Sequence, residues 1–198
     1  MWLISLLFIT WSSPQVLVDR IVASVDKKLI TLSEIQQIAL IKCLDIQGDA
    51  CLTLPLNADI LENARQHAIY EQLIINAASH AYEPIVDLQI NERIAFLQSK
   101  LSSPDAFNQW MARAHLSMQE LKDLIKRMQQ VALFLENRIR FRIEITQEDI
   151  AHYKTQHPKL FDEEIKAQLK QEAFNQRTQA YVKDLAKNAD IKRIGRLE

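Results

Sequence analysis

The stretch VDRIVASVDKKLITLSEI, residues 18–35, decides the fold. Its first part is rich in β-branched apolar residues and predicts a short strand. The polar break at residues 26–28 predicts a turn, after which residues 29–31 resume the strand character. Thr31 and Glu34 then have the spacing of a capping box. In that motif the Thr31 hydroxyl accepts from the Glu34 amide while the Glu34 carboxylate reaches back to the Thr31 amide, so a helix should start here.

Two strands alone are marginal in water and need a third partner. The other segment with strand character is ADIKRI, residues 189–194. We therefore predict that the two ends of the chain meet in a small sheet and that the residues between them are helical. The expected fold class is mainly α, a helical core with a small β-sheet formed by the N-terminal hairpin and the C-terminal strand.

The composition supports this fold class and excludes some functions. Average usage would give about 14 glycines, but the chain has 2, Gly48 and Gly195. Few tight turns are therefore available, which favours long helices over a glycine-rich catalytic sheet or phosphate loop. The net charge is −1, from 24 basic and 25 acidic residues, so no strong field attracts nucleic acid or anionic lipid.

Capping signals and helical spacing predict a series of helices between the strands. The one that starts at Asn57 or Asp59 and runs to about Ala81 is apolar on nearly all sides in its second half, so we expect it to be the central core helix. Arginines alternate with apolar residues over 138–143, where an extended connector is expected. The predicted helices are residues 33–44, 57–81, 87–101, 104–114, 117–139, 146–157 and 161–187.

Residues 2–11, WLISLLFITW, form an uncharged apolar run. The run is too short to span a bilayer as a helix, and it fits the apolar region of a secretory signal. No basic residue precedes it and no clean small-residue cleavage site follows it. The alternative is a buried N-terminal strand or helix of a cytosolic protein. We expect residues 1–17 to be a signal peptide, with the cleavage site left open.

The two cysteines, Cys43 and Cys51, flank a short loop with Gly48 at its tip. In an oxidising compartment, cysteines this close can form a disulfide that pins the loop. The alternative is two unpaired, small apolar residues. The spacing is not C-x-x-C, so redox catalysis is not expected.

Catalytic motifs are missing from the sequence. The five histidines show neither an H-E-x-x-H motif nor paired ligand spacing on one helix face, and there is no G-x-S-x-G. We therefore expect no enzyme activity, no catalytic, cofactor-binding or metal-binding residues, and no cofactor. The histidines are His67, His80, His115, His152 and His157.

Three segments together resemble one known family. Residues 18–35, residues 145–150 (ITQEDI) and residues 179–185 (QAYVKDL) follow one another as in the SurA-type periplasmic chaperones. The resemblance covers nearly all of residues 18–198, and it rests on the order of the pieces. It implies a periplasmic protein with one chaperone domain, in which residues 146–198 form a C-terminal helix and strand that return to the N-terminal helical part, residues 18–145.

The chain departs from the family at one point. Full-length members insert parvulin-type prolyl isomerase domains between the Ile-Thr-x-Glu-Asp-Ile segment and the last long helix. Here Ile150 is followed almost directly by the helix that starts at Phe161, and no glycine lies between Gly48 and Gly195. The resemblance is therefore to the chaperone core without the isomerase, and isomerase activity is not carried over.

The function expected from this resemblance is an ATP-independent chaperone, or holdase. It would bind unfolded or extended segments of secreted or outer-membrane proteins, without nucleic acid and without stable membrane insertion. Exposed, adaptable apolar side chains would make such a surface. The same side chains can also be core, because they recur at helical spacing. The candidate client-binding residues are Phe107, Trp110, Met111, Met118, Phe134 and Phe141.

A second hypothesis is a non-catalytic helical adaptor or structural subunit that docks one specific envelope protein, for instance a separate isomerase. One partner at one-to-one stoichiometry would favour the adaptor, whereas many substoichiometric clients would favour the holdase. An active prolyl isomerase is a third and less favoured hypothesis. Client identity and oligomeric state stay open at this stage.

Overall fold

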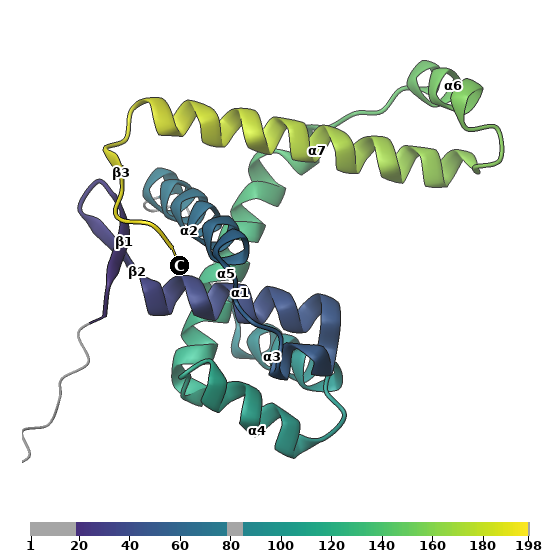
Figure 1. The fold of residues 1–198 in the computed structure, drawn as a ribbon. Helices are drawn as coiled ribbons and strands as arrows, with labels where there is room; N and C mark the ends of the chain where they lie inside the picture. Colours follow the sequence, from purple (N-terminus) through teal and green to yellow (C-terminus); the bar gives the residue numbers. More distant parts are fainter. Residues whose placement is uncertain (1–18, 79–84, 198) are drawn as a thin grey trace, which may run out of the picture.

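The computed structural model describes residues 19–78 and 85–197 (Figure 1). The described residues are mainly helical with one small sheet, which confirms the predicted fold class. The predicted signal peptide (1–17) and the predicted end of the core helix at Ala81 lie outside the described residues. The elements are β1 (Ile21–Val25), β2 (Lys28–Thr31), α1 (Leu32–Gln47), α2 (Ala58–Ala78), α3 (Asp87–Ser99), α4 (Pro104–Arg113), α5 (Met118–Arg138), α6 (Gln147–Gln156), α7 (Asp162–Lys187) and β3 (Ile191–Arg193), with 3-10 turns η1 (Gly48–Leu52) and η2 (Arg140–Arg142).

The sheet joins the two ends of the described chain, as predicted. Its strand order is β2-β1-β3, and both pairings are antiparallel. In the middle strand, Val25 pairs with Lys28 on one side and with Ile191 on the other. Val22, Ala23 and Val25 are fully buried, because a central strand is covered by neighbours on both edges and here also on both faces.

The helix starts follow the capping chemistry expected from the sequence, with one correction. Ser117 and Glu120 form a complete capping box at α5, and Ser103 caps α4 with Pro104 at the first helical position. At α1 only half of the predicted box forms. The Thr31 hydroxyl accepts from the Glu34 amide at 3.4 Å, but the Glu34 carboxylate pairs with an arginine of α5 instead.

Two hydrophobic clusters make up the interior, and α1 separates them. Leu40, Ile41 and Leu44 pack toward α3, α4 and α5, in a cluster that contains the fully buried Trp110. Ile35 and Ile38 pack toward the sheet and α2. The prediction of α2 as the central helix is therefore corrected: α2 belongs to one cluster, whereas α1 contributes to both.

Helix α6 and the first part of α7 form an arm that extends away from the rest of the molecule (Figure 1). In α7 only Ile165 and Val182 are buried. The connector to the arm is a single 3-10 turn, η2, followed by extended backbone at Ile143, so the prediction of an extended connector over residues 138–143 was only partly right. Among the described residues, no helix is both long and apolar enough to cross a membrane.

Candidate functional site

The structure does not bring the six predicted client-binding residues together. Phe107 and Trp110 lie in the core, with their rings stacked at a centroid distance of 5.9 Å. The Trp110 Nε1–H donates to the Leu40 carbonyl oxygen at 3.4 Å. Met111 is buried beside them. The prediction that these three residues face a client is therefore wrong for this conformation, because the apolar face of α4 is the face that packs inward.

The other three predicted residues lie outside that cluster, on α5 or η2, and in different settings. Met118 is exposed at the start of α5, and Phe141 is 76 % exposed on η2. Phe134 is half-buried next to Tyr181 of α7, with ring centroids 6.5 Å apart. Only Met118 and Phe141 offer substantial apolar surface to a partner.

The feature best suited to hold a partner is a groove between α3 and α5, which we call the α3–α5 groove. It contains two pockets of about 440 and about 200 Å³. The two pockets adjoin each other, since Arg93, Gln129 and Ala132 line both. The apolar lining residues are Ile41, Ile85, Ile125, Met128, Ala132 and Leu133, and the polar ones are Gln89, Glu92, Arg93, Gln129 and Glu136.

One polar atom in this groove lacks a partner. The Gln129 side-chain amide donates to the Gln89 carbonyl oxygen at 3.3 Å. Its Oε1 atom is buried and has no hydrogen bond to any described residue. A buried acceptor without a donor is costly, on the order of 1–3 kcal/mol. An N–H group that enters the groove would remove this cost once the Gln129 side chain rotates and exposes the atom.

The charged residues at the groove are mostly engaged with each other. Arg93 pairs with Asp45 of α1, and Glu136 pairs with the Nε atom of Arg140 at 2.6 Å. Glu92 is exposed and has no ion pair among the described residues. The groove therefore presents an apolar floor with amide groups rather than a strong field of one sign.

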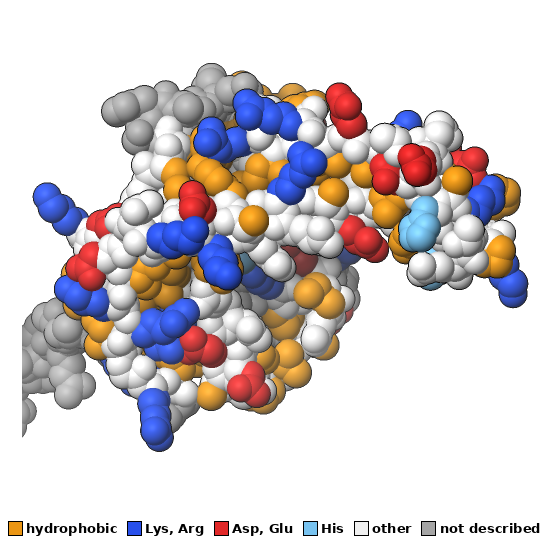
Figure 2. All heavy atoms as spheres, turned by 90° about the horizontal axis from the view of Figure 1, so that it is seen from above, with side chains coloured by type: hydrophobic (Ala, Val, Ile, Leu, Met, Phe, Trp, Pro, Cys, Tyr) orange, Lys and Arg blue, Asp and Glu red, His pale blue; other side chains and the backbone are white. Residues whose placement is uncertain are grey.

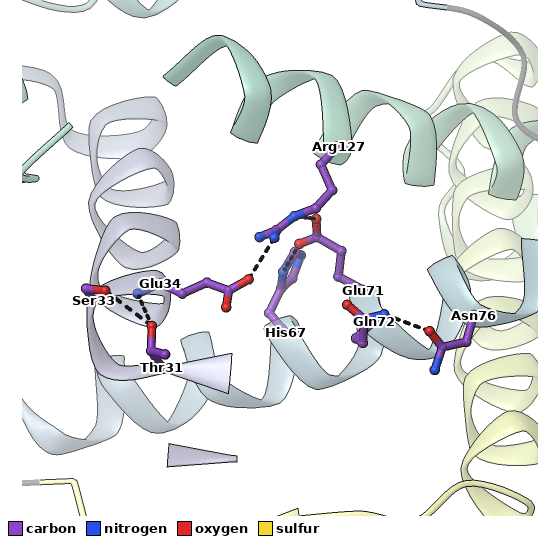
Figure 3. Close-up of polar contacts among 8 residues, drawn as sticks. All are labelled: Thr31, Ser33, Glu34, His67, Glu71, Gln72, Asn76 and Arg127. Atoms are coloured by element: carbon purple, nitrogen blue, oxygen red, sulfur yellow. Dashed lines mark hydrogen bonds and ion pairs between the residues drawn. The ribbon is translucent and has the colours of Figure 1, made fainter. Parts of the chain in front are cut away.

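A second polar constellation lies between α1, α2 and α5 (Figure 3). Arg127 of α5 donates from Nη1 to Glu34 of α1 at 2.7 Å and from Nε to Glu71 of α2 at 2.8 Å. Glu71 is 3 % exposed, and its second oxygen lies 3.8 Å from Nδ1 of His67. We call Glu34, His67, Glu71 and Arg127 the interhelix cluster.

Burial dominates the electrostatics of the interhelix cluster. It raises the pKa of Glu71, against the opposing effect of the Arg127 charge. It also lowers the pKa of His67 to about 4, and the positive charges of Lys42 and Arg127 act in the same direction. Burial opposes the charge of Arg127 as well, yet Glu71 and Glu34 hold its pKa above the ordinary value.

None of the four residues of the interhelix cluster lines the five best-formed pockets between the described elements. Arg127 binds one oxygen of each carboxylate, the second oxygen of Glu71 is buried without a hydrogen bond, and His67 is neutral at pH 7. The two ion pairs of Arg127 connect α5 to α1 and to α2.

The loop after α1 is fixed by several contacts. Cys43 and Cys51 are joined by a disulfide with Cα atoms 5.7 Å apart. Arg113 of α4 donates from Nη1 to the Cys51 carbonyl oxygen at 2.7 Å. Gly48 has a positive φ of 55°, and a Cβ there would lie 2.6 Å from the Lys100 carbonyl oxygen, so only glycine fits. The bridge is thus part of a rigid junction between α1, α3 and α4.

The described residues contain no group of three His, Cys, Asp or Glu side chains placed to hold a metal ion. No protein-family model matches this chain, and a search of curated proteins finds no match either.

Sequence reasoning missed the α3–α5 groove and the interhelix cluster. Leu133 makes a second apolar flank on α5, and this was the available signal for the groove. Glu71 is the one charged residue in the mainly apolar second half of α2, residues 69–78, and this was the signal for a buried charge that needs a partner. Neither signal identifies which other helix packs against these residues.

Proposed function

We propose that this chain is an ATP-independent chaperone of the SurA type that holds unfolded or extended polypeptide segments in the α3–α5 groove. The observation that carries the proposal is the apolar groove with the unpartnered Gln129 acceptor. An unfolded segment supplies both apolar side chains for the floor and backbone N–H groups for that acceptor. The periplasm is the proposed location, and prolyl isomerase activity is not part of the proposal.

Further apolar surface near the groove supports a role in binding varied segments. Val86 and Leu88, at the start of α3, are 55 % and 66 % exposed. Phe96, on the same helix, is 44 % exposed between Arg93 and Lys100, which lie 5.1 and 4.7 Å from its ring centroid. Apolar side chains gathered on one exposed element favour interaction with other proteins.

The test is light scattering of a urea-unfolded outer-membrane porin diluted with and without the full chain. Ala132→Glu is the informative variant, because Ala132 is exposed and lines both pockets of the groove. Glutamate suits a helix, so the fold should persist while a charge enters the apolar site. We expect that half-suppression of aggregation needs about ten-fold more variant than parent, equivalent to about 1.4 kcal/mol of binding.

The matched control is Ala151→Glu, the same change at an exposed position of α6. It should suppress aggregation as well as the parent does. A parent chain that leaves porin aggregation unchanged at molar excess would contradict the proposal. Co-purification of a single partner at one-to-one stoichiometry would instead support the adaptor hypothesis.

A further inference from the structure

A different pocket, of about 690 Å³, lies between α2, α7 and β3. Its apolar lining consists of Ile69, Tyr70, Ala186 and Ile191. Figure 2 looks onto the face that carries α7, and in its left half lysine and arginine side chains gather with apolar ones where α7 leads into β3. The polar lining residues are Gln66, Gln179, Lys183 and Arg193.

The charged side chains that line this pocket are all positive. Lys183 and Arg193 line it, and no carboxylate does. Two carboxylates close to these residues in sequence are engaged elsewhere, since Asp184 pairs with Lys187 and Asp190 with Lys192, both at 3.0 Å. Lys183 has no ion pair among the described residues. The pocket is therefore complementary to a carboxylate.

The backbone of β3 adds a second and independent observation. The backbone carbonyl oxygen of Asp190 accepts from the Asp26 amide at 2.8 Å, and the Ile194 amide donates to the Val22 carbonyl oxygen at 2.9 Å. Both groups face β1. Because backbone groups alternate along a strand, the N–H and C=O groups of Ile191 and Arg193 face the opposite edge. β3 ends the sheet order, so this edge is not covered by another strand of the described sheet.

We propose that this pocket binds an extended acidic peptide segment of another protein, which pairs with the free edge of β3 and places a carboxylate against Lys183 and Arg193. Strand addition of this kind draws affinity from backbone hydrogen bonds and specificity from alternate side chains in adjoining pockets. Apolar side chains of the segment contact Ile69, Tyr70 and Ala186. The site lies apart from the α3–α5 groove and does not depend on the function proposed for it.

The first experiment measures fluorescence anisotropy with the full chain and a fluorescein-labelled peptide amide, Asp-Val-Glu-Val-Asp. The comparison probe is Lys-Val-Lys-Val-Lys. We expect the acidic probe to bind at least about ten-fold more tightly than the basic one, and Lys183→Glu to remove that preference. Equal binding of the two probes, or an unchanged preference in Lys183→Glu, would overturn the proposal.

Two controls separate this site from the rest of the chain. Lys170→Glu makes the same charge change on α7 away from the pocket and should leave the acidic probe bound as in the parent. Ala132→Glu blocks only the α3–α5 groove, so it should also leave binding of the acidic probe unchanged. Loss of acidic-probe binding in Ala132→Glu would place the acidic peptide in the groove and overturn the second site.

The strand pairing is tested in the probe, so that the protein fold is not disturbed. One acidic peptide carries N-methyl groups on the two valine amides and another on the central glutamate amide. Alternate amides of a paired strand face opposite edges, so only one of the two peptides keeps the N–H groups that face β3. We expect the two affinities to differ by about ten-fold. Equal affinities would overturn the strand pairing.

Discussion

Helix α2 of the body and helix α7, whose first part belongs to the arm, differ in what stabilises them. α2 has 21 residues, of which nine are buried. α7 has 26 residues, of which only Ile165 and Val182 are buried. A helix gains most of its stability from packing its apolar face. α2 should therefore melt only with the whole protein, whereas the first part of α7 should open locally.

The same difference distinguishes the rigid surface of the body from the more adaptable surface of the arm. The α3–α5 groove lies on helices that pack into the core with Trp110, whereas the arm adds no residue to either hydrophobic cluster and is held by contacts of other kinds. One of these is the hydrogen bond from Arg177 of α7 to the Arg142 carbonyl oxygen at 3.0 Å. Another is the contact of the Arg140 guanidinium with the Phe174 ring, at 4.1 Å from its centroid. Three predictions test this contrast.

The largest effect is expected for Arg127→Met. The substitution leaves the Glu71 carboxylate buried without its charged partner, which should cost about 3–5 kcal/mol of unfolding free energy. Urea denaturation followed by circular dichroism measures this loss. Arg177→Met in α7 is the control and should stay within about 0.5 kcal/mol of the parent. Similar losses in the two variants would contradict the contrast between body and arm.

Two cavity-forming substitutions, one in the body and one in the arm, should differ in whether they lower global or only local stability. Leu73→Ala in α2 removes a side chain that is 3 % exposed and should lower the global unfolding free energy by about 2–5 kcal/mol. Ile165→Ala in α7 also empties a buried position, but Ile165 lies between Asp162 and Gln168, which both contact α6.

Because Ile165 belongs to the arm, its removal should leave the global value within about 0.5 kcal/mol of the parent. Hydrogen exchange should become faster in α6 and the first part of α7, and not in α2. Mass spectrometry of the exchanged peptides provides the measurement. Faster exchange throughout the chain would show that the arm and the body unfold together.

The smallest effect is expected for the pH dependence of the folding stability. Because the pKa of His67 falls from 6.5 to about 4 on folding, the unfolded chain takes up a proton between these values and the folded chain does not. Stability should therefore decrease as the pH falls from about 6.5 to about 4. Glu71 acts in the opposite sense, because its raised pKa favours the folded state at low pH and that contribution is lost as the pH rises above 4.5.

The His67 contribution is modest because only part of the ring, including Nδ1, is buried; the side chain as a whole is 39 % exposed, so solvent screens its interactions. His67→Gln should flatten the decline in melting temperature below pH 6.5. The exposed His152 on α6 is the control, and His152→Gln should leave the decline as in the parent. An unchanged decline in His67→Gln would contradict the role assigned to this histidine.

Local chemistry made part of the fold predictable. The alternating apolar residues of the hairpin and the caps at Ser103, Ser117 and Thr146 act over a few residues, so they can be recognised without the tertiary structure. The third strand could also be predicted, since a hairpin needs a partner and one other strand-like segment exists in the sequence.

Most of the candidate site could not be predicted from the sequence. Helical spacing shows that Phe107 and Trp110 share a face of α4, but it does not tell whether that face meets another helix or a client. The packing of α4 against α1 decided that they are core. In the same way, Gln129 became a candidate ligand only when α3 was placed beside α5.

The sequence by itself therefore determined the mainly helical class, the starts of the helices and the return of the C-terminal strand to the N-terminal hairpin. These follow from residue spacing and backbone hydrogen bonding near each residue. Only the tertiary structure decided that Glu34 pairs with Arg127, that the arm projects, and where the α3–α5 groove and the pocket beside β3 lie. The physical reason is that a groove or a buried ion pair depends on the relative placement of helices far apart in the chain, which the periodicity of one helix does not specify.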